Sequence, residues 1–230
     1  MELHILGKYG PYGKAGVGAA SGYLITENDT TILLDMGSGV LSRLIDKIDI
    51  KKLDAIYISH LHFDHTSDLL PFRYLLEELD HKMTIYTHKE DSEWYRILFN
   101  HYLFNVIPID ENTTIQLKDI SLSFFLMDHP MTNYAIKIKG EDKTFLYTGD
   151  TRYCQNLFDA LTNVDCALAD CSKPSVFIGG HMTADKAIEI HKKTGIRIIA
   201  THLSPDFSPD ELFKGYEKIE VAQEHKTYKI

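Results

Sequence analysis

The chain has 230 residues, 44% of them apolar and 25% charged, which predicts one folded domain over residues 1–230 with a sizeable core. Its formal net charge of -9 argues against broad, non-specific binding to a nucleic-acid backbone. No apolar run is long enough to cross a bilayer, and Met1–Gly7 lacks the pattern of a secretory signal. The cysteines Cys154, Cys166 and Cys171 form no CxxC pair and predict reduced thiols. We therefore expect a cytoplasmic protein with no membrane partner.

The chain begins with a predicted strand, Glu2–Leu6, that leads into a glycine-rich stretch from Gly7 to Gly22. This stretch matches neither nucleotide-binding glycine motif, because its glycine spacing is wrong and a strand follows where a helix is needed. We expect a flexible loop near the substrate. Lys8 and Lys14 on this loop are either solvated or in contact with an anionic substrate.

The remaining elements follow from hydrophobic periodicity and turn signals. Further strands are predicted at Tyr23–Thr26, Thr31–Asp35, Leu53–Ile58, Met83–Thr87, Asn105–Ile109, Thr113–Leu117, Ser121–Met127, Tyr134–Ile138, Thr144–Tyr147, Cys166–Ala169 and Arg197–Ala200. Helices are predicted at Leu41–Lys47, Ser67–Leu79, Glu90–Tyr102, Gln155–Leu161, Thr183–Thr194 and Pro209–Glu220. The order of strands and helices recurs loosely in both halves, which favours an α/β fold: a four-layer αββα sandwich of two mixed sheets with outer helices.

A dense cluster of metal-ligand types, His60-Leu61-His62-Phe63-Asp64-His65, follows the apolar run Ala55–Ile58. Imidazole and carboxylate groups suit divalent zinc, with manganese or iron as alternatives. Each histidine alone is equally typical of a hydrogen-bonded surface residue. Four matched positions at fixed spacing arise by chance only on the order of once in a thousand sequences, so the cluster favours a metal site. Its density suggests two ions.

Three further candidate ligands each follow a predicted strand. His129 comes after Ser121–Met127, Asp150 after Thr144–Tyr147 and His202 after Arg197–Ala200. Taken singly, a polar residue at a strand end is usually structural. Together with the cluster, they supply ligands for two metal ions.

These residues resemble the hallmark of the metallo-β-lactamase superfamily, and the resemblance runs from about Ser21 to His202. The resemblance implies one ion held by His60, His62 and His129, a second held by Asp64, His65 and His202, and Asp150 bridging the two. It also implies a metal-bridging hydroxide, and we count Asp64 among the catalytic residues as well as the ligands. Asp35 corresponds to a family aspartate that braces the site loop, and Asp128 is a second candidate for fixing an imidazole.

The segment Gly180-His181-Met182-Thr183-Ala184 resembles the tRNase Z branch and its phosphodiesterase relatives. The resemblance implies that His181 lies near the scissile phosphate and serves the leaving group, with Asp170 orienting it. The alternative is that His181 caps the following helix. The chain departs from tRNase Z because it lacks the long tRNA-binding arm and has Asp170 where those enzymes usually have glutamate.

We therefore expect a dinuclear metal hydrolase and, in the first place, a phosphodiesterase for a small or cyclic phosphodiester. The alternatives are hydrolysis of an acyl ester, thioester or lactam, a tRNase Z-like ribonuclease, and a non-catalytic metal-binding module. The expected partner is a small anionic molecule, with nucleic acid less favoured, and the protein is expected to be a homodimer. Cys171 is either an inert buried thiol or a group near the site.

Overall fold

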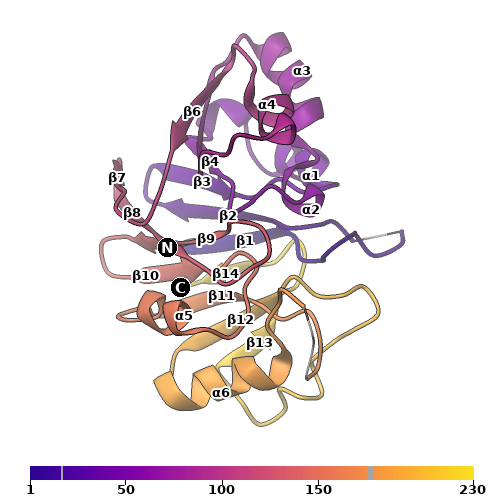
Figure 1. Cartoon of the computed structure of the whole chain (residues 1–230), viewed down its shortest axis with the longest axis vertical. Helices are drawn as coiled ribbons and strands as arrows, with labels where there is room; N and C mark the ends of the chain where they lie inside the picture. The colour runs from indigo at the N-terminus through magenta and orange to yellow at the C-terminus, as the bar shows by residue number, and fades with distance from the viewer. Residues whose placement is uncertain (17, 176–178) are drawn as a thin grey trace.

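Two seven-stranded mixed sheets form the centre of the protein in the computed structural model, which describes residues 1–16, 18–175 and 179–230 (Figure 1). The first sheet has the order β14 (Thr227–Lys229), β1 (Glu2–Gly7), β2 (Gly22–Glu27), β3 (Thr30–Leu34), β4 (Ala55–Tyr57), β5 (Met83–Thr87) and β6 (Phe104–Pro108). The second has the order β13 (Ile219–Val221), β12 (Arg197–Thr201), β11 (Cys166–Asp170), β10 (Thr144–Tyr147), β9 (Tyr134–Lys139), β8 (Ile120–Leu126) and β7 (Thr114–Leu117).

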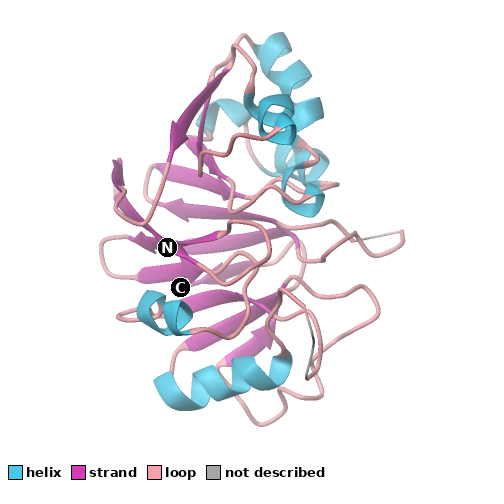
Figure 2. Ribbon diagram, in the orientation of Figure 1, coloured by secondary structure: helices cyan, strands magenta, loops and turns pink. Residues whose placement is uncertain are grey.

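The helices lie on the outer faces of the two sheets (Figure 2). The first sheet is covered by α1 (Val40–Lys47), α3 (Leu69–Leu79) and α4 (Glu93–Phe99), and the second by α5 (Gln155–Ala160) and α6 (Ala184–Thr194). The short α2 (Phe63–Thr66) follows the loop after β4. This arrangement is the predicted four-layer αββα sandwich.

The strand pattern explains why the chain forms this sandwich. Along β2, Tyr23 and Ile25 belong to the cluster between the sheets, whereas Leu24 belongs to the cluster under the helices. On β10, Phe145 belongs to the cluster between the sheets, whereas Leu146 belongs to the cluster under the helices. Because successive strand residues point to opposite faces, strands buried on both sides need apolar residues at nearly every position.

The parallel part of each sheet determines where polar residues collect. Strands β3, β4, β5 and β6 pair in parallel, as do β10, β11, β12 and β13. The carboxyl ends of parallel strands share one edge, so the loops that follow β4, β10, β11 and β12 can converge. These loops contain the candidate site residues except His129, which follows the antiparallel strand β8.

The predicted helix Pro209–Glu220 is wrong. This segment forms successive turns, with Phe213 N–H donating to Pro209 O and Tyr216 N–H to Phe213 O, and Gly215 has a φ of 86° that no helix accommodates. Its end instead forms β13, which pairs in parallel with β12. The apolar residues Leu212, Phe213 and Tyr216 are spaced as they would be on one face of a helix, which explains the wrong prediction. Strand β14 was also not predicted from the sequence.

Within the described ranges, no helix combines the length and apolar character needed to cross a membrane.

We predict an acid-dependent loss of stability caused by His4. Its ring lies in β1, 7% exposed, with Nδ1 2.8 Å from Thr227 Oγ1. Burial, together with the positive charges of Lys47 and His225, lowers the pKa of His4 from 6.5 to about 4. The unfolded chain therefore binds this proton first, so the free energy of unfolding should fall as the pH drops from about 6.5 towards 4. Urea unfolding at pH 7 and pH 5 should show a smaller difference for His4→Gln than for the wild type. An equal difference in both proteins would contradict the role of His4.

Candidate metal centre

The first part of the site is built by the turn between β4 and α2. The strand ends at Tyr57, and the next residues carry His60, which is fully buried, and His62, which precedes the first turn of α2. His65 N–H donates to His62 O at 3.0 Å, closing that turn. Because the turn is so tight, His60, His62, Asp64 and His65 occupy one small region at the edge of the sheet.

One group of ligand atoms combines this turn with the ends of two strands in the second sheet. His60 Nε2 lies 2.9 Å from His62 Nδ1, and His62 Nδ1 lies 3.3 Å from His129 Nε2. Asp150 Oδ2 lies 3.4 Å from His60 Nε2. These residues each offer one ligand atom within 4.8 Å of the others, a spacing that can hold a metal ion.

A second group lies beside the first and shares Asp150 with it. Asp64 Oδ2 lies 3.0 Å from His202 Nε2 and 3.6 Å from His65 Nε2. Asp150 reaches this group through both of its oxygens, with Oδ2 3.3 Å from His202 Nε2 and Oδ1 3.4 Å from His65 Nε2. Asp150 therefore stands between the two groups, in the position expected of a bridging carboxylate.

Two buried atoms test whether a cation fits this centre. His65 Nε2 and Asp150 Oδ1 have no hydrogen-bond partner among the residues that the structure describes, although both side chains are at most 1% exposed. A buried polar atom without a partner is costly, and native proteins rarely leave one unexplained. A divalent cation would accept electron pairs from both atoms, so the donor set fits a metal site.

The electrostatics also suit metal binding. Burial and the neighbouring His65 lower the pKa of His60 to about 3, and burial lowers the pKa values of His62 and His129, so these rings are neutral and keep a free lone pair. Burial alone would raise the pKa of Asp150, but the nearby His202 and His65 hold it well below its usual range.

The neighbouring carboxylates affect the pKa of His202 more than burial does. Burial opposes its charged form, but Asp150 and the hydrogen bond to Asp64 raise the pKa of His202 to about 9. A cation therefore has to displace a proton from this ring when it binds.

Asp35 braces the centre from behind, in the place expected from the sequence. Its Oδ2 accepts hydrogen bonds from His65 Nδ1, Ser59 Oγ and Tyr147 OH, each at 2.7 Å, and its Oδ1 accepts from Ser59 N–H at 2.7 Å. Because Nδ1 of His65 is held in this way, its Nε2 is directed at the centre. His129 is held instead by a backbone carbonyl, since its Nδ1 donates to Gly180 O at 2.8 Å.

Two other residues suggested by the sequence, Asp128 and Cys171, do not take part in the candidate metal centre. Asp128 is exposed and pairs with Arg152 at 2.7 Å, so it fixes no imidazole. Cys171 is fully buried, and burial raises the pKa of its thiol well above the usual value. This thiol is inert at neutral pH.

His181 faces the same centre but is bound to a different carboxylate. Its Nδ1 lies 3.0 Å from Asp170 Oδ2 and 3.7 Å from Asp150 Oδ2. Burial lowers the pKa of His181, but Asp170 outweighs burial and raises it. The residue that precedes α6 is Thr183, so His181 does not occupy the N-cap position of that helix.

Asp170 is itself fixed in place. It is fully buried and accepts hydrogen bonds from Thr151 N–H at 3.1 Å, Met182 N–H at 3.3 Å and Ser172 Oγ at 3.1 Å. The shorter reach of an aspartate is thus sufficient to contact His181. The same Ser172 Oγ lies 3.1 Å from His202 Nδ1, which ties Asp170 to a candidate ligand.

Several supporting residues were not predicted from the sequence. Ser59 and Tyr147 donate hydrogen bonds to Asp35, Ser59 Oγ also lies 3.1 Å from His60 Nδ1, and Ser172 Oγ lies 3.1 Å from His202 Nδ1. Gly10 lies directly against the His202 ring. A Cβ on Gly10 would fall 2.0 Å from His202 Nε2. The only signal in the sequence is that these residues lie next to strand ends or in the glycine-rich loop, which does not single them out.

Comparisons with known proteins identify the class. A beta-lactamase superfamily domain matches residues 30–203, so the chain belongs to this superfamily. The fold and the candidate ligand groups are those of a metal-dependent hydrolase of that superfamily.

Among the relatives, the chain is 30% identical over 213 residues to the "Probable metallo-hydrolase YhfI" of Bacillus subtilis (strain 168), covering 88% of this chain and 87% of that protein. A crystal structure of YhfI from Bacillus subtilis superposes with a TM-score of 0.91 over 99% of this chain and 98% of that one, at 28% identity. The chain is also 24% identical over 240 residues to a ribonuclease Z of Saccharolobus solfataricus, covering 80% of this chain and 82% of that protein. A diphosphatase from the PhnP family shares the fold, with a TM-score of 0.80 at 17% identity, covering 100% of this chain and 97% of that one.

We predict that Asp35→Asn weakens metal binding by roughly 10–100-fold, the usual effect of losing a residue that orients a ligand. An amide offers one acceptor oxygen where the carboxylate now accepts several hydrogen bonds, so the His65 ring loses its fixed orientation. Competition with a chelator measures the affinity, and Asp128→Asn on the exposed Arg152 pair is the matched control. An affinity equal to that of the control would show that Asp35 does not support the centre.

Proposed function

We propose that the protein is a phosphodiesterase that uses two divalent cations, zinc in the first instance, to hydrolyse a small or cyclic phosphodiester. The single observation that carries this proposal is His181. It faces the candidate metal centre and is oriented by the buried Asp170, whose Oδ2 lies 3.0 Å from its Nδ1. His181 also forms a third group of ligand-type side chains with Asp150, Asp170 and His202, but it lies outside the groups of His60, His62 and His129 and of Asp64, His65 and His202. Because Asp170 holds Nδ1, we assign His181 to the substrate rather than to a metal ion.

The ligand assignment follows the two groups. His60, His62 and His129 would hold one ion, Asp64, His65 and His202 the other, and Asp150 would touch both. Bound there, the cations supply Lewis-acid stabilisation of phosphoryl oxygens and a water of lowered pKa.

The chain's own residues then complete the chemistry. Asp170 accepts the Nδ1–H of His181, which favours the cationic ring and leaves Nε2–H available for the leaving oxygen. Proton donation prevents an alkoxide from having to leave with a full negative charge. Asp35 and the Gly180 carbonyl keep His65 and His129 in the tautomers that the ligand assignment requires.

One group of relatives supports phosphodiester chemistry. A ribonuclease Z matches along 80% of this chain, and its name specifies cleavage of RNA. We do not extend that substrate to this chain, because the long tRNA-binding arm is absent from its sequence.

Three expectations from the sequence stay predictions: a single domain over residues 1–230, a homodimer, and a cytoplasmic location.

The direct test is hydrolysis of bis-p-nitrophenyl phosphate by the metal-loaded protein, beside a chelated sample and p-nitrophenyl acetate as the acyl ester. We expect cleavage of the diester that chelation abolishes, and much weaker cleavage of the acetate. Turnover of the acetate without the diester would move the function to acyl hydrolysis. Inactivity towards both, with metal bound, would favour a binding module.

We predict that His62→Ala loses metal and diesterase activity together, because His62 Nδ1 lies within 3.3 Å of both neighbouring histidines in its group. Metal content by elemental analysis and turnover of the diester are the two readouts. Full turnover with normal metal content would refute the ligand assignment.

We predict that His181→Ala keeps its metal but loses diesterase rate by roughly two orders of magnitude or more, the usual contribution of a positioned acid. The loss should be smallest for diesters with a good leaving group, which need little proton donation. His191→Ala, a histidine in α6 that bonds to Ile196 O, is the matched control. A rate equal to that of the control would leave His181 without a catalytic role.

A further inference from the structure

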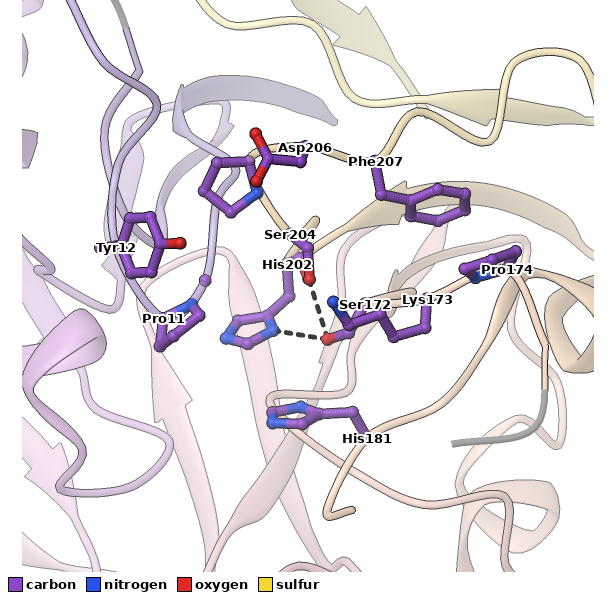
Figure 3. A pocket seen from close by; sticks show the side chains of 12 residues that line it. Pro11, Tyr12, Ser172, Lys173, Pro174, His181, His202, Ser204, Asp206 and Phe207 are labelled. Carbon is purple, nitrogen blue, oxygen red and sulfur yellow. Dashed lines mark hydrogen bonds between the residues drawn. The ribbon is translucent and has the colours of Figure 1, made fainter. Parts of the chain in front are cut away.

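A cavity of about 650 Å³ opens on one side of the candidate metal centre (Figure 3). His181 and His202 lie at its base, whereas His60, His62 and His129 are not among its described lining residues. Under the proposed function, His181 serves the leaving oxygen. The cavity therefore lies where the leaving-group side of the substrate would extend.

The walls of this cavity carry aromatic side chains on opposite sides. Figure 3 shows Tyr12 on one side of His202 and Phe207 on the other. Tyr12 is 60% exposed, although a tyrosine on a loop would ordinarily gain by packing. An exposed ring at the rim of a cavity is typical of a surface that stacks on a flat ligand.

The glycine-rich loop holds Tyr12 in this place. Gly10 packs against the His202 ring so closely that only a hydrogen side chain fits there. Gly10 N–H donates to Leu203 O at 3.1 Å, and Leu203 N–H donates to Lys8 O at 2.9 Å. The start of the loop is thereby fixed to the strand end that carries His202, and Tyr12 follows two residues later.

Charged side chains also line the cavity. Lys173 is the one cationic side chain of the lysine or arginine type among its described lining residues, and no ion pair links it to another described residue. Asp206 at the rim is the one carboxylate among them. A ligand with a flat ring, hydroxyl groups and a phosphate matches stacking surfaces, a hydrogen-bond acceptor and a cation in one cavity.

We propose, on the basis of the proposed function, that this cavity is a nucleoside subsite in which a base stacks on Tyr12 and Phe207 and the adjoining phosphate lies near Lys173. The substrate class is then a phosphodiester whose leaving group carries a nucleobase. Gly10, Pro11 and Tyr12, near the start of the glycine-rich loop, form the wall that contacts the base.

The test compares adenosine 5′-monophosphate with ribose 5-phosphate by titration calorimetry on the metal-loaded full-length protein. The two probes share the sugar and the phosphate, so their difference reports the base. We expect the nucleotide to bind roughly 5–150-fold more tightly, the range that corresponds to one stacked base. Tyr12→Ala and Phe207→Ala should remove most of this preference without weakening ribose 5-phosphate, whereas Tyr12→Phe should keep it.

Further variants separate the parts of the subsite. Lys173→Gln should weaken both probes to the same degree, because it acts on the phosphate. Tyr74→Ala, which removes another exposed aromatic ring from α3 outside the cavity, should change neither. Tyr12→Ala is informative even if Phe207→Ala fails to fold, since the Tyr12 side chain is mostly exposed.

The outcomes distinguish this subsite from the proposed function. Equal binding of the two probes, or a preference unchanged in Tyr12→Ala, overturns the subsite even if the diester is hydrolysed. A base preference that depends on Tyr12, in a protein that cleaves no diester, upholds the cavity as a nucleotide site and refutes the phosphodiesterase proposal.

Discussion

Two buried carboxylates among imidazole rings are the constraint on which the rest of the site depends. Asp150 is 1% exposed and lies within 3.4 Å of His60, His65 and His202, and Asp64 is 7% exposed beside His202. Removing a carboxylate from water is costly unless nearby positive charge and hydrogen bonds compensate. His65 Nε2 and Asp150 Oδ1 lie 3.4 Å apart, and neither has a hydrogen-bond partner among the described residues, so the protein itself does not complete that compensation. A bound cation at this point would satisfy them.

The centre lies between the two sheets of the sandwich, and each sheet supplies only part of its residues. The first sheet contributes the turn after β4, and the second contributes the ends of β8, β10 and β12. The apolar cluster between the sheets fixes their relative position, and Tyr147 connects that cluster to Asp35 through its hydroxyl group. Packing of the core therefore sets the ligand distances, and the site is preorganised by the fold.

The sequence predicted the fold, and the structure brings the candidate ligands selected from the sequence together at one edge of the sheets, for physical reasons that apply to both. Strands buried on two faces are continuously apolar, so their ends are visible, and polar residues immediately after them stand out. For that reason the sequence already indicated the candidate metal ligands, namely the cluster His60–His65 and the isolated His129, Asp150 and His202. The helix expected at Pro209–Glu220 shows the limit of periodicity, because a series of turns with Phe213 buried produces the same spacing. The supporting contacts of Ser172, Tyr147 and Gly10 depend on pairing between distant segments, which no local pattern encodes.

The most direct test of the account is the number of divalent ions bound per chain, measured by elemental analysis of the purified protein together with the Asp150→Ala variant. We predict two ions per wild-type chain and a marked loss in the variant, because Asp150 is the group that both halves of the centre share. A folded wild-type protein that binds no divalent ion, or a variant that keeps both, would contradict the central claim that Asp150 joins two metal ions.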